Sequence, residues 1–342
     1  MKSKNLLEFN DCGIYCSKGG FYIDPWKPVS RAIITHAHSD HAKYGNKYYL
    51  AHHLTAPILK YRLGADILLE AVEFGQEIFM NGVKVSFHPA GHIVGSAQIR
   101  VEDNGEVWVV SGDYKTENDG ISGELEVVKC HTFISESTFG LPVFKWQNQQ
   151  EIYNDINNWW KTNVEKGKAS ILCGYALGKT QRIIKNLDPA IGPIFAHGAV
   201  QNINDLLIKA GINLPSTTLA TSEISKEVYK KSIIISVPSS LNSPWVKKFG
   251  PFSSALASGW MNLRGTKRRK AVDRGFVLSD HADWNGLNEV ILATSAERVL
   301  VTHGYKSSFA RWLREKGINA QEVETLYEGE SLDTEDLVAA VL

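Results

Sequence analysis

Thr35-His36-Ala37-His38-Ser39-Asp40-His41 is the stretch that decides the fold, and it follows directly on the apolar, strand-like run 32–34. It places three imidazoles and a carboxylate within six residues. Neutral imidazole and carboxylate are preferred ligands of Zn²⁺ and related divalent ions. The alternating spacing lets His36 and His38 face one ion while Asp40 and His41 face another. The stretch therefore predicts a metal site on a loop at a strand end, rather than a polar turn that is merely rich in histidine.

The composition is that of an ordinary globular protein. The chain has 342 residues, enough for two domains or for one large domain with an insertion. Its 37 Lys and Arg residues balance 37 Asp and Glu residues, so binding to a polyanion requires a local patch. The four cysteines form no C-x-x-C pair, which favours reduced thiols and a cytoplasmic location. Because no 18 apolar residues run together, we expect neither an ordinary export signal nor a membrane span or membrane partner.

Five further strand-like runs are each followed by polar residues that can bind a metal. They lead to His92 after 83–87, Asp113 after 107–110, Glu136 after 132–135, Asp280-His281 after 276–279 and His303 after 299–302. Rigid sheets commonly present functional groups on loops at strand ends. A single His or Asp in such a place is more often a capping or turn residue than a ligand. Five such ends beside residues 35–41 favour one shared site instead.

The number of candidate ligands indicates two ions. The candidates divide into a first set of His36, His38 and His92, a second set of Asp40, His41 and His303, and Asp113 as a bridge between them. Two ions about 3.5–4 Å apart can activate a water and clamp both oxygens of a phosphoryl displacement. A structural zinc needs only four ligands, so seven candidates predict catalysis. Imidazole-rich sites suit Zn²⁺, and Mn²⁺ competes where carboxylates share the shell.

The order of these residues resembles the metallo-β-lactamase fold and, with Glu136, Asp280-His281 and His303, its β-CASP nuclease branch. Within that branch, four stretches look like the bacterial ligase-associated DNA exonucleases, which are similar to the eukaryotic Artemis nucleases. These stretches are 137–142, 174–181, 258–261 and 279–284. The resemblance spans nearly the whole chain. It implies an α/β fold, specifically a four-layer αββα metallo-β-lactamase sandwich with an inserted β-CASP domain.

The resemblance also implies roles for single residues. Motifs A, B and C of the branch match Glu136, His281 and His303. Asp113 and Asp40 would hold and orient the attacking hydroxide. His281 would contact the phosphate or assist the leaving oxygen, and Glu136 would fix an imidazole. The implied activity is exonuclease action on DNA ends from the 5′ side, in DNA repair and in association with an ATP-dependent DNA ligase.

One residue departs from the DNA-cleaving pattern. Artemis-like enzymes usually carry an apolar residue at motif C, whereas RNA-processing β-CASP enzymes carry a histidine, as His303 is here. An RNA exo- or endonuclease therefore remains the alternative. A small-ester hydrolase of the same fold would need no insertion, and a non-catalytic scaffold would have lost ligands that this chain keeps.

The candidate ligands occupy the chain up to about 136 and again from about 280, so the stretch between them is expected to be an insertion. We expect a first metallo-β-lactamase part at 1–145, a β-CASP insertion at 146–262 and a second metallo-β-lactamase part at 263–342. Near-helical apolar spacing over 152–164 predicts an amphipathic helix. Its Trp159 and Trp160 are expected to pack in a core rather than to stack on bases.

Two stretches are candidate contacts for nucleic acid. Gly178-Lys179-Thr180 fails the G-x-x-x-x-G-K-[ST] spacing, which excludes an ATPase site. A strand, a glycine turn and a helix start remain there, and they would either bind phosphate through Lys179 and Gln181 or be purely structural. The second stretch has five cationic residues within seven positions, Arg264, Lys267, Arg268, Arg269 and Lys270. In a chain of zero net charge it predicts a patch for a nucleic-acid backbone, with solvated surface charge as the alternative.

Overall fold

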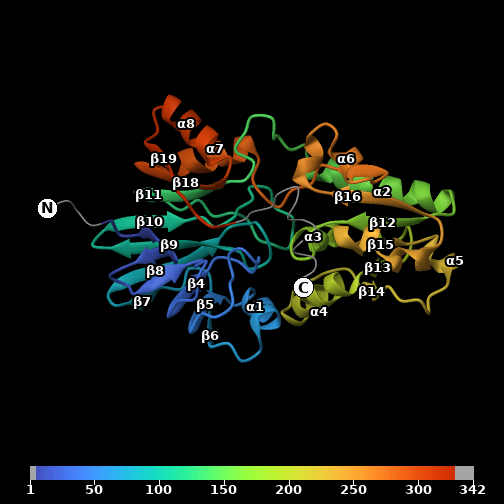
Figure 1. Ribbon diagram of the computed structural model, residues 1–342, viewed down its shortest axis with the longest axis horizontal. Helices are drawn as coiled ribbons and strands as arrows, with labels where there is room; N and C mark the ends of the chain where they lie inside the picture. The colour runs from blue at the N-terminus through green and yellow to red at the C-terminus, as the bar shows by residue number, and fades with distance from the viewer. Residues whose placement is uncertain (1–4, 328–342) are drawn as a thin grey trace. The chain divides into compact units, whose positions relative to one another are not determined.

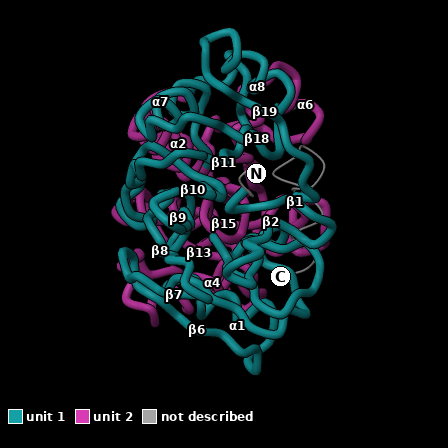
Figure 2. Tube along the Cα trace, turned by 90° about the vertical axis from the view of Figure 1, so that its left-hand side faces the viewer, with its two compact units in different colours: residues 1–145, 281–330 teal, residues 146–280, 331–342 magenta. Residues whose placement is uncertain are grey.

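The computed structural model describes residues 5–327, and the chain divides into two compact units (Figure 2). Among the described residues, unit 1 comprises 5–145 and 281–327, and unit 2 comprises 146–280. The second boundary differs from the one expected between 262 and 263. Residues 263–280 belong to unit 2 because β17 (Arg274–Phe276) pairs with β16 (Phe252–Ala257).

The first sheet of unit 1 has six strands in sequence order, β1 to β6. Figure 1 labels β4, β5 and β6 of this sheet. Strands β1 to β3 pair antiparallel, and β3 to β6 pair parallel. The elements are β1 (Glu8–Asn10), β2 (Gly13–Cys16), β3 (Phe21–Ile23), β4 (Arg31–Ile34), β5 (Tyr48–His52) and β6 (Leu69–Val72), with α1 (Ala56–Leu63) between the last two. Because β4, β5 and β6 run the same way, their carboxyl ends lie at one edge, and residues 35–41 follow β4 there.

The second sheet of unit 1 has seven strands in the order β19-β18-β11-β10-β9-β8-β7. Strands β7 to β10 pair antiparallel, whereas β10, β11, β18 and β19 pair parallel. The bounds are β7 (Ile78–Met80), β8 (Val83–Pro89), β9 (Ala97–Asp103), β10 (Glu106–Val110), β11 (Thr132–Ser137), β18 (Arg298–Gly304) and β19 (Ala320–Glu322), with α7 (Trp284–Thr294) and α8 (Lys306–Glu315). His303 thus lies within β18, not after it.

The seven-stranded sheet is buried on both faces. In β18, Leu300 packs in one apolar cluster with residues of the six-stranded sheet, while Val299 and Val301 pack in another with residues of α7 and α8. Figure 1 shows α7 and α8 on the side of the seven-stranded sheet away from β4, β5 and β6. This alternation results from the two-residue period of a strand. Fully burying a Val or Leu side chain contributes about 1.5–3 kcal/mol. The apolar alternation of the strands therefore fixes which face each side chain takes, and so the position of the strand-end residues.

Unit 2 is built on a parallel six-stranded sheet, in the order β14-β13-β15-β12-β16-β17. Its other strands are β12 (Ala169–Cys173), β13 (Ile194–Ala196), β14 (Thr218–Leu219) and β15 (Ile233–Ser236). Its helices are α2 (Gln149–Glu165), α3 (Lys179–Lys185), α4 (Gly198–Lys209), α5 (Lys226–Tyr229), η1 (Pro238–Asn242), η2 (Pro244–Phe249), η3 (Gly259–Asn262) and α6 (Thr266–Arg269).

Both faces of the parallel sheet in unit 2 are covered, as such sheets require. Leu172 of β12 packs against α2 and α3, whereas its neighbours Ile171 and Cys173 pack in a second cluster with Tyr229 of α5. The expected core role of the tryptophan pair in α2 is confirmed, because Trp159 and Trp160 are buried in the first of these clusters. The strand expected at 276–279 lies earlier, since β17 covers Arg274–Phe276 and shares only Phe276 with that run.

Two expectations from composition can be compared with the structure. The four cysteines all lie in the described part of the chain and form no disulfide. Within residues 5–327 no helix combines the length and the apolar character that crossing a membrane requires.

Candidate metal centre

The candidate metal centre lies in unit 1, where strand ends and loops bring the expected ligands together. Residues 35–41 follow β4, His92 lies between β8 and β9, Asp113 follows β10, and His303 lies in β18. All the expected histidine ligands and Asp113 are buried, and Asp40 retains 14 % side-chain exposure. The site is therefore largely shielded, with Asp40 as its most accessible ligand.

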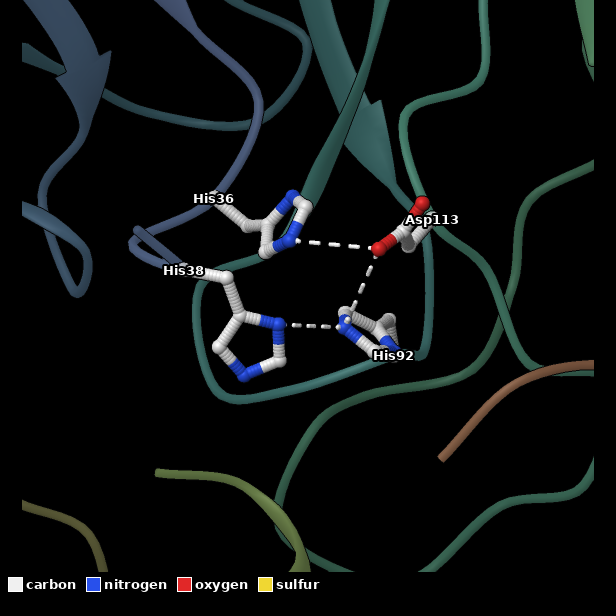
Figure 3. A group of neighbouring side chains, drawn as sticks. All are labelled: His36, His38, His92 and Asp113. Carbon is white, nitrogen blue, oxygen red and sulfur yellow. Dashed lines mark hydrogen bonds and ion pairs between the residues drawn. The ribbon is translucent and has the colours of Figure 1, made fainter. Parts of the chain in front are cut away.

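A first cluster joins His36, His38, His92 and Asp113, and Figure 3 shows these side chains facing one another. One potential ligand atom from each lies within 4.8 Å of all the others. His92 Nε2 lies 3.1 Å from His38 Nδ1, and Asp113 Oδ2 lies 3.5 Å from His36 Nε2. Ligands at 2.0–2.1 Å from a tetrahedral Zn²⁺ are roughly 3.4 Å apart. The spacing of the cluster therefore fits a divalent metal ion.

A second cluster joins His41, His303 and the same Asp113. Asp113 Oδ1 lies 3.0 Å from His303 Nε2, and Oδ2 lies 3.5 Å from His41 Nε2. Asp40 is adjacent, because its Oδ2 lies 3.5 Å from the same nitrogen of His41. The structure thus brings all seven expected ligands together, with Asp113 in both clusters.

The buried polar atoms of the site fit divalent cations. Among the described residues, His36 Nε2 and His41 Nε2 are buried without a hydrogen-bond partner, which costs about 1–3 kcal/mol per group. Burial and the neighbouring histidines hold the pKa of His36 well below its usual range, so this ring is neutral and can donate its lone pair. Burial also acts to lower the pKa of His41, but Asp113, Asp40 and Asp24 outweigh it and raise that pKa to about 10. A pocket that favours positive charge so strongly suits a metal ion.

Asp24 is a site residue that the sequence reasoning missed. Its Oδ2 lies 2.8 Å from His41 Nδ1, and its carboxylate also accepts hydrogen bonds from the amide and hydroxyl of Thr35. The contact fixes the His41 ring so that Nε2 faces Asp113. Asp24 directly follows β3, so the signal that found the other ligands, a polar residue after a short apolar strand, could have found it.

Tyr327 also went unnoticed, since no motif in the sequence marks it. Its ring stacks on His41 with centroids 4.5 Å apart and planes 9° from parallel. Its hydroxyl donates to the backbone oxygen of Asp24 at 3.2 Å. The His41 ring is therefore held both by a carboxylate at its edge and by an aromatic face.

We expect Asp24→Asn to weaken binding of one of the two ions by about 10–100-fold, the usual effect of losing an anionic partner of a metal-bound histidine. The ion held by His36, His38 and His92 should bind as before. Calorimetric titration of the metal-free protein measures both affinities. Asp119→Asn is the matched control, because Asp119 is a buried carboxylate that accepts from Ile121 N and Ser122. Equal effects of the two substitutions would contradict a specific role for Asp24.

Glu136 and His281 form a pair beside the metal ligands. Glu136 Oε2 lies 2.9 Å from His281 Nδ1, and Oε1 accepts the amide hydrogen of Tyr114 at 2.7 Å. Potential ligand atoms of Asp113, Glu136 and His281 lie within 4.8 Å of one another. Glu136 thus fixes the His281 ring next to Asp113, with its Nδ1 engaged and Nε2 on the other side of the ring.

No protein-family model matches the chain. The chain is 30 % identical over 311 residues to the "Probable DNA ligase" of Opitutus terrae, an alignment that covers 90 % of this chain and 30 % of that protein. It is 33 % identical over 122 residues to "Endoribonuclease YSH1" of Eremothecium gossypii, covering 35 % of this chain and 16 % of that protein. The chain belongs to the β-CASP branch of the metallo-β-lactamase fold.

This β-CASP chain spans less than a third of the length of either relative. A solved structure from Enterococcus faecalis, described as a protein of unknown function, matches it with a TM-score of 0.56 at 11 % identity. The match covers 86 % of this chain and 79 % of that one. At this identity the likeness concerns the fold alone.

Lys179 and Gln181 lie inside unit 2 of this β-CASP protein. Both side chains are fully buried, with Lys179 Nζ 3.7 Å from the carboxylate of Asp280. Gln181 accepts the amide hydrogen of Gly178 and donates to Ala176 O and to the side chain of Asn204. Neither side chain reaches the surface in this structure, and their contact with nucleic acid stays a prediction. The hydrogen bonds of Gln181 within the turn agree with the alternative, a structural glycine turn.

The basic run lies at the surface of unit 2, around α6. Arg264, Arg268 and Arg269 are exposed, and Lys270 is partly buried. The side chain of Lys267 lies outside the described part of the structure. Contact of this run with nucleic acid stays a prediction.

Proposed function

We propose that this β-CASP protein is a two-metal hydrolase of phosphodiester bonds in DNA, acting as an exonuclease from the 5′ end. The observation that carries the proposal is Asp113, which lies within ligand distance of two separate sets of buried imidazoles. Zn²⁺ is the proposed ion because imidazole dominates the donor set, with Mn²⁺ as the alternative. A purely structural ion would not require a second set of ligands around the same carboxylate.

Two bound ions would supply a water of lowered pKa and positive charge for the phosphate oxygens. Asp113 and Asp40 would orient the attacking oxygen and accept its hydrogen bonds. His281, held through Nδ1 by Glu136, would turn Nε2 to the phosphate or to the leaving oxygen. Glu136 acts by positioning that imidazole, and the Tyr114 amide, which donates to Glu136 Oε1, holds the carboxylate in place.

Two considerations support DNA as the substrate. The relative named as a probable DNA ligase aligns with 90 % of this chain, and the motifs resemble those of ligase-associated exonucleases. We propose, on the same basis, action in DNA repair together with an ATP-dependent DNA ligase, in the cytoplasm. RNA is the second candidate, favoured by His303 and by the relative named as an endoribonuclease.

We also propose a structural identity for each of the two units. We propose that unit 1 is a four-layer αββα sandwich in which α1 forms the layer outside the six-stranded sheet. Contacts between α1 and β6, and the packing of α7 and α8 on the other sheet, support this. Unit 2, residues 146–280, would then be the β-CASP insertion.

One assay tests the proposed substrate. Single- and double-stranded DNA, labelled at either end, and RNA of the same sequence are incubated with the protein and Zn²⁺, Mn²⁺ or Mg²⁺. We expect DNA to be degraded from the 5′ end and RNA to remain intact. Asp113→Ala, purified in parallel, controls for contaminating nuclease. Robust cleavage of RNA with no cleavage of DNA would contradict the proposal that DNA is the substrate. It would not contradict the assignment of the metal ligands.

Neutralising Arg268 and Arg269 together to Gln should weaken binding of single-stranded DNA. Each lost phosphate contact should reduce the slope of log affinity against log salt by roughly one unit. Turnover at saturating substrate should change little. Fluorescence anisotropy at several salt concentrations gives the slope. Arg311→Gln with Lys316→Gln is the matched control, because it removes the same charge from exposed positions near the end of α8. Equal salt-dependence slopes for both variants would show that the basic run is ordinary solvated surface charge.

A further inference from the structure

We propose that unit 1 carries a further binding site for a Zn²⁺-type transition-metal ion, formed by His52, His53 and Glu73. One potential ligand atom from each of the three residues lies within 4.8 Å of the others. None of them belongs to the candidate metal centre described above. Two imidazoles and one carboxylate are the ligand set of a three-ligand zinc site with one open position.

The backbone holds these residues at adjacent strand ends. His52 is the last residue of β5 and lies opposite Val72 of β6, and Glu73 directly follows that strand. The amide of His53 donates to Val72 O at 3.0 Å, which extends the pairing by one step. The parallel ladder therefore fixes the spacing between the histidine pair and the carboxylate.

The outer two ligands already face each other. His53 Nδ1 lies 2.8 Å from Glu73 Oε2, in a direct contact that is shorter than the roughly 3.4 Å between two ligands of a tetrahedral zinc. Their side chains are 42 % and 67 % exposed, so small rotations can open that gap. The same exposure gives an ion a direct path from solvent.

His52 supplies the rigid part of the site. It is 1 % exposed, and its ring stacks on Phe74 with centroids 3.7 Å apart. Its Nε2 is buried without a hydrogen-bond partner in the described part of the chain. The contact from Leu54 N to Nδ1 is 3.4 Å, too long to fix which nitrogen carries the proton.

The charge state of His52 agrees with a ligand role. Burial, and to a lesser degree the neighbouring His53, lowers the pKa of His52 to about 4. The ring is then neutral near pH 7, the form that binds metal. A neutral buried imidazole beside an exposed imidazole and a carboxylate gives a half-open site from which the ion can exchange.

Zinc titration of the full, metal-free chain by calorimetry, with elemental analysis after dialysis, tests this proposal. Wild type should bind one ion more than the two of the metal centre, and Asp113→Ala should keep that further ion. His53→Ala and Glu73→Gln should each weaken it by at least about tenfold, since even supporting residues have effects of that size. Because both side chains are exposed, circular dichroism should show an unchanged fold.

His88→Ala is the matched control, because His88 Nδ1 also pairs with a carboxylate, Glu126, at 2.9 Å in unit 1. The described structure offers no third ligand to that pair. Retention of the further ion by His88→Ala and its loss in His53→Ala would support the site. Absence of a further ion in wild type, or equal affinity in wild type and both His53→Ala and Glu73→Gln, would overturn it.

Discussion

Asp113→Ala should abolish phosphodiester hydrolysis and reduce bound metal below two ions per chain. The two oxygens of Asp113 lie 3.0 Å from His303 Nε2 and 3.5 Å from His36 Nε2, so this carboxylate serves both clusters. Its removal takes a negative charge from a buried site that must hold two cations. We expect the rate to fall by more than about 100-fold, because 100-fold is already the upper end of the loss caused by removing a merely supporting partner.

Hydrolysis of end-labelled DNA and elemental analysis of the same preparation together measure this effect. Asp113→Asn keeps the shape of the side chain and isolates the loss of charge. Asp119→Asn, at a buried carboxylate that bonds to Ser122, should leave both rate and metal content unchanged. An Asp113→Ala protein with full activity and two bound ions would contradict the two-metal mechanism.

The ligands of the metal centre could be predicted because each lies at or near a strand end. A short apolar run marks a strand, and β4 and β10 carry the residues after them to the edges of their sheets. A histidine or aspartate after such a run therefore has a predictable place. The exact strand ends were less predictable, since Glu136 lies inside β11 and His303 inside β18 instead of beyond them.

Residues that act through packing could not be predicted in the same way. Tyr327 stacks on His41, a residue far away in the sequence, and neither spacing nor periodicity marks that contact. Lys179 has the residue type of a phosphate ligand, but its partner is the buried carboxylate of Asp280. A lysine after a glycine turn can form a buried ion pair or contact a substrate. The sequence pattern is the same in both cases, and only the tertiary structure distinguishes them.

The second boundary between the two units differs from the expected domain boundary for a similar reason. Residues 263–280 contain β17, the edge strand that pairs with β16 in the sheet of unit 2. The basic run and the approach to Asp280-His281 suggested a return to the metal-binding unit. Pairing at a sheet edge depends on which strand has an unpaired edge. The order of the strands decides this, and the sequence alone does not give that order.

His281→Ala should slow hydrolysis by about 10²–10⁴-fold, the contribution of a positioned proton donor or acceptor. Both ions should remain bound, because His281 is outside the two ligand sets. This retention of metal distinguishes the variant from Asp113→Ala. The hydrolysis rate of Glu136→Gln should lie between those of wild type and His281→Ala. This substitution leaves the imidazole in place but removes the carboxylate that lies 2.9 Å from its Nδ1.

Single-turnover hydrolysis of DNA at saturating enzyme, with metal analysis of each variant, checks the role of His281. His88→Ala is again the control, because it removes a histidine of the same unit whose Nδ1 is also paired with a glutamate at 2.9 Å. If His281 acts on the phosphate or the leaving oxygen, a substrate with a better leaving group should restore part of the lost rate, because less proton transfer is then needed. The same loss for both leaving groups, or loss of a metal ion from His281→Ala, would assign His281 to the metal shell instead.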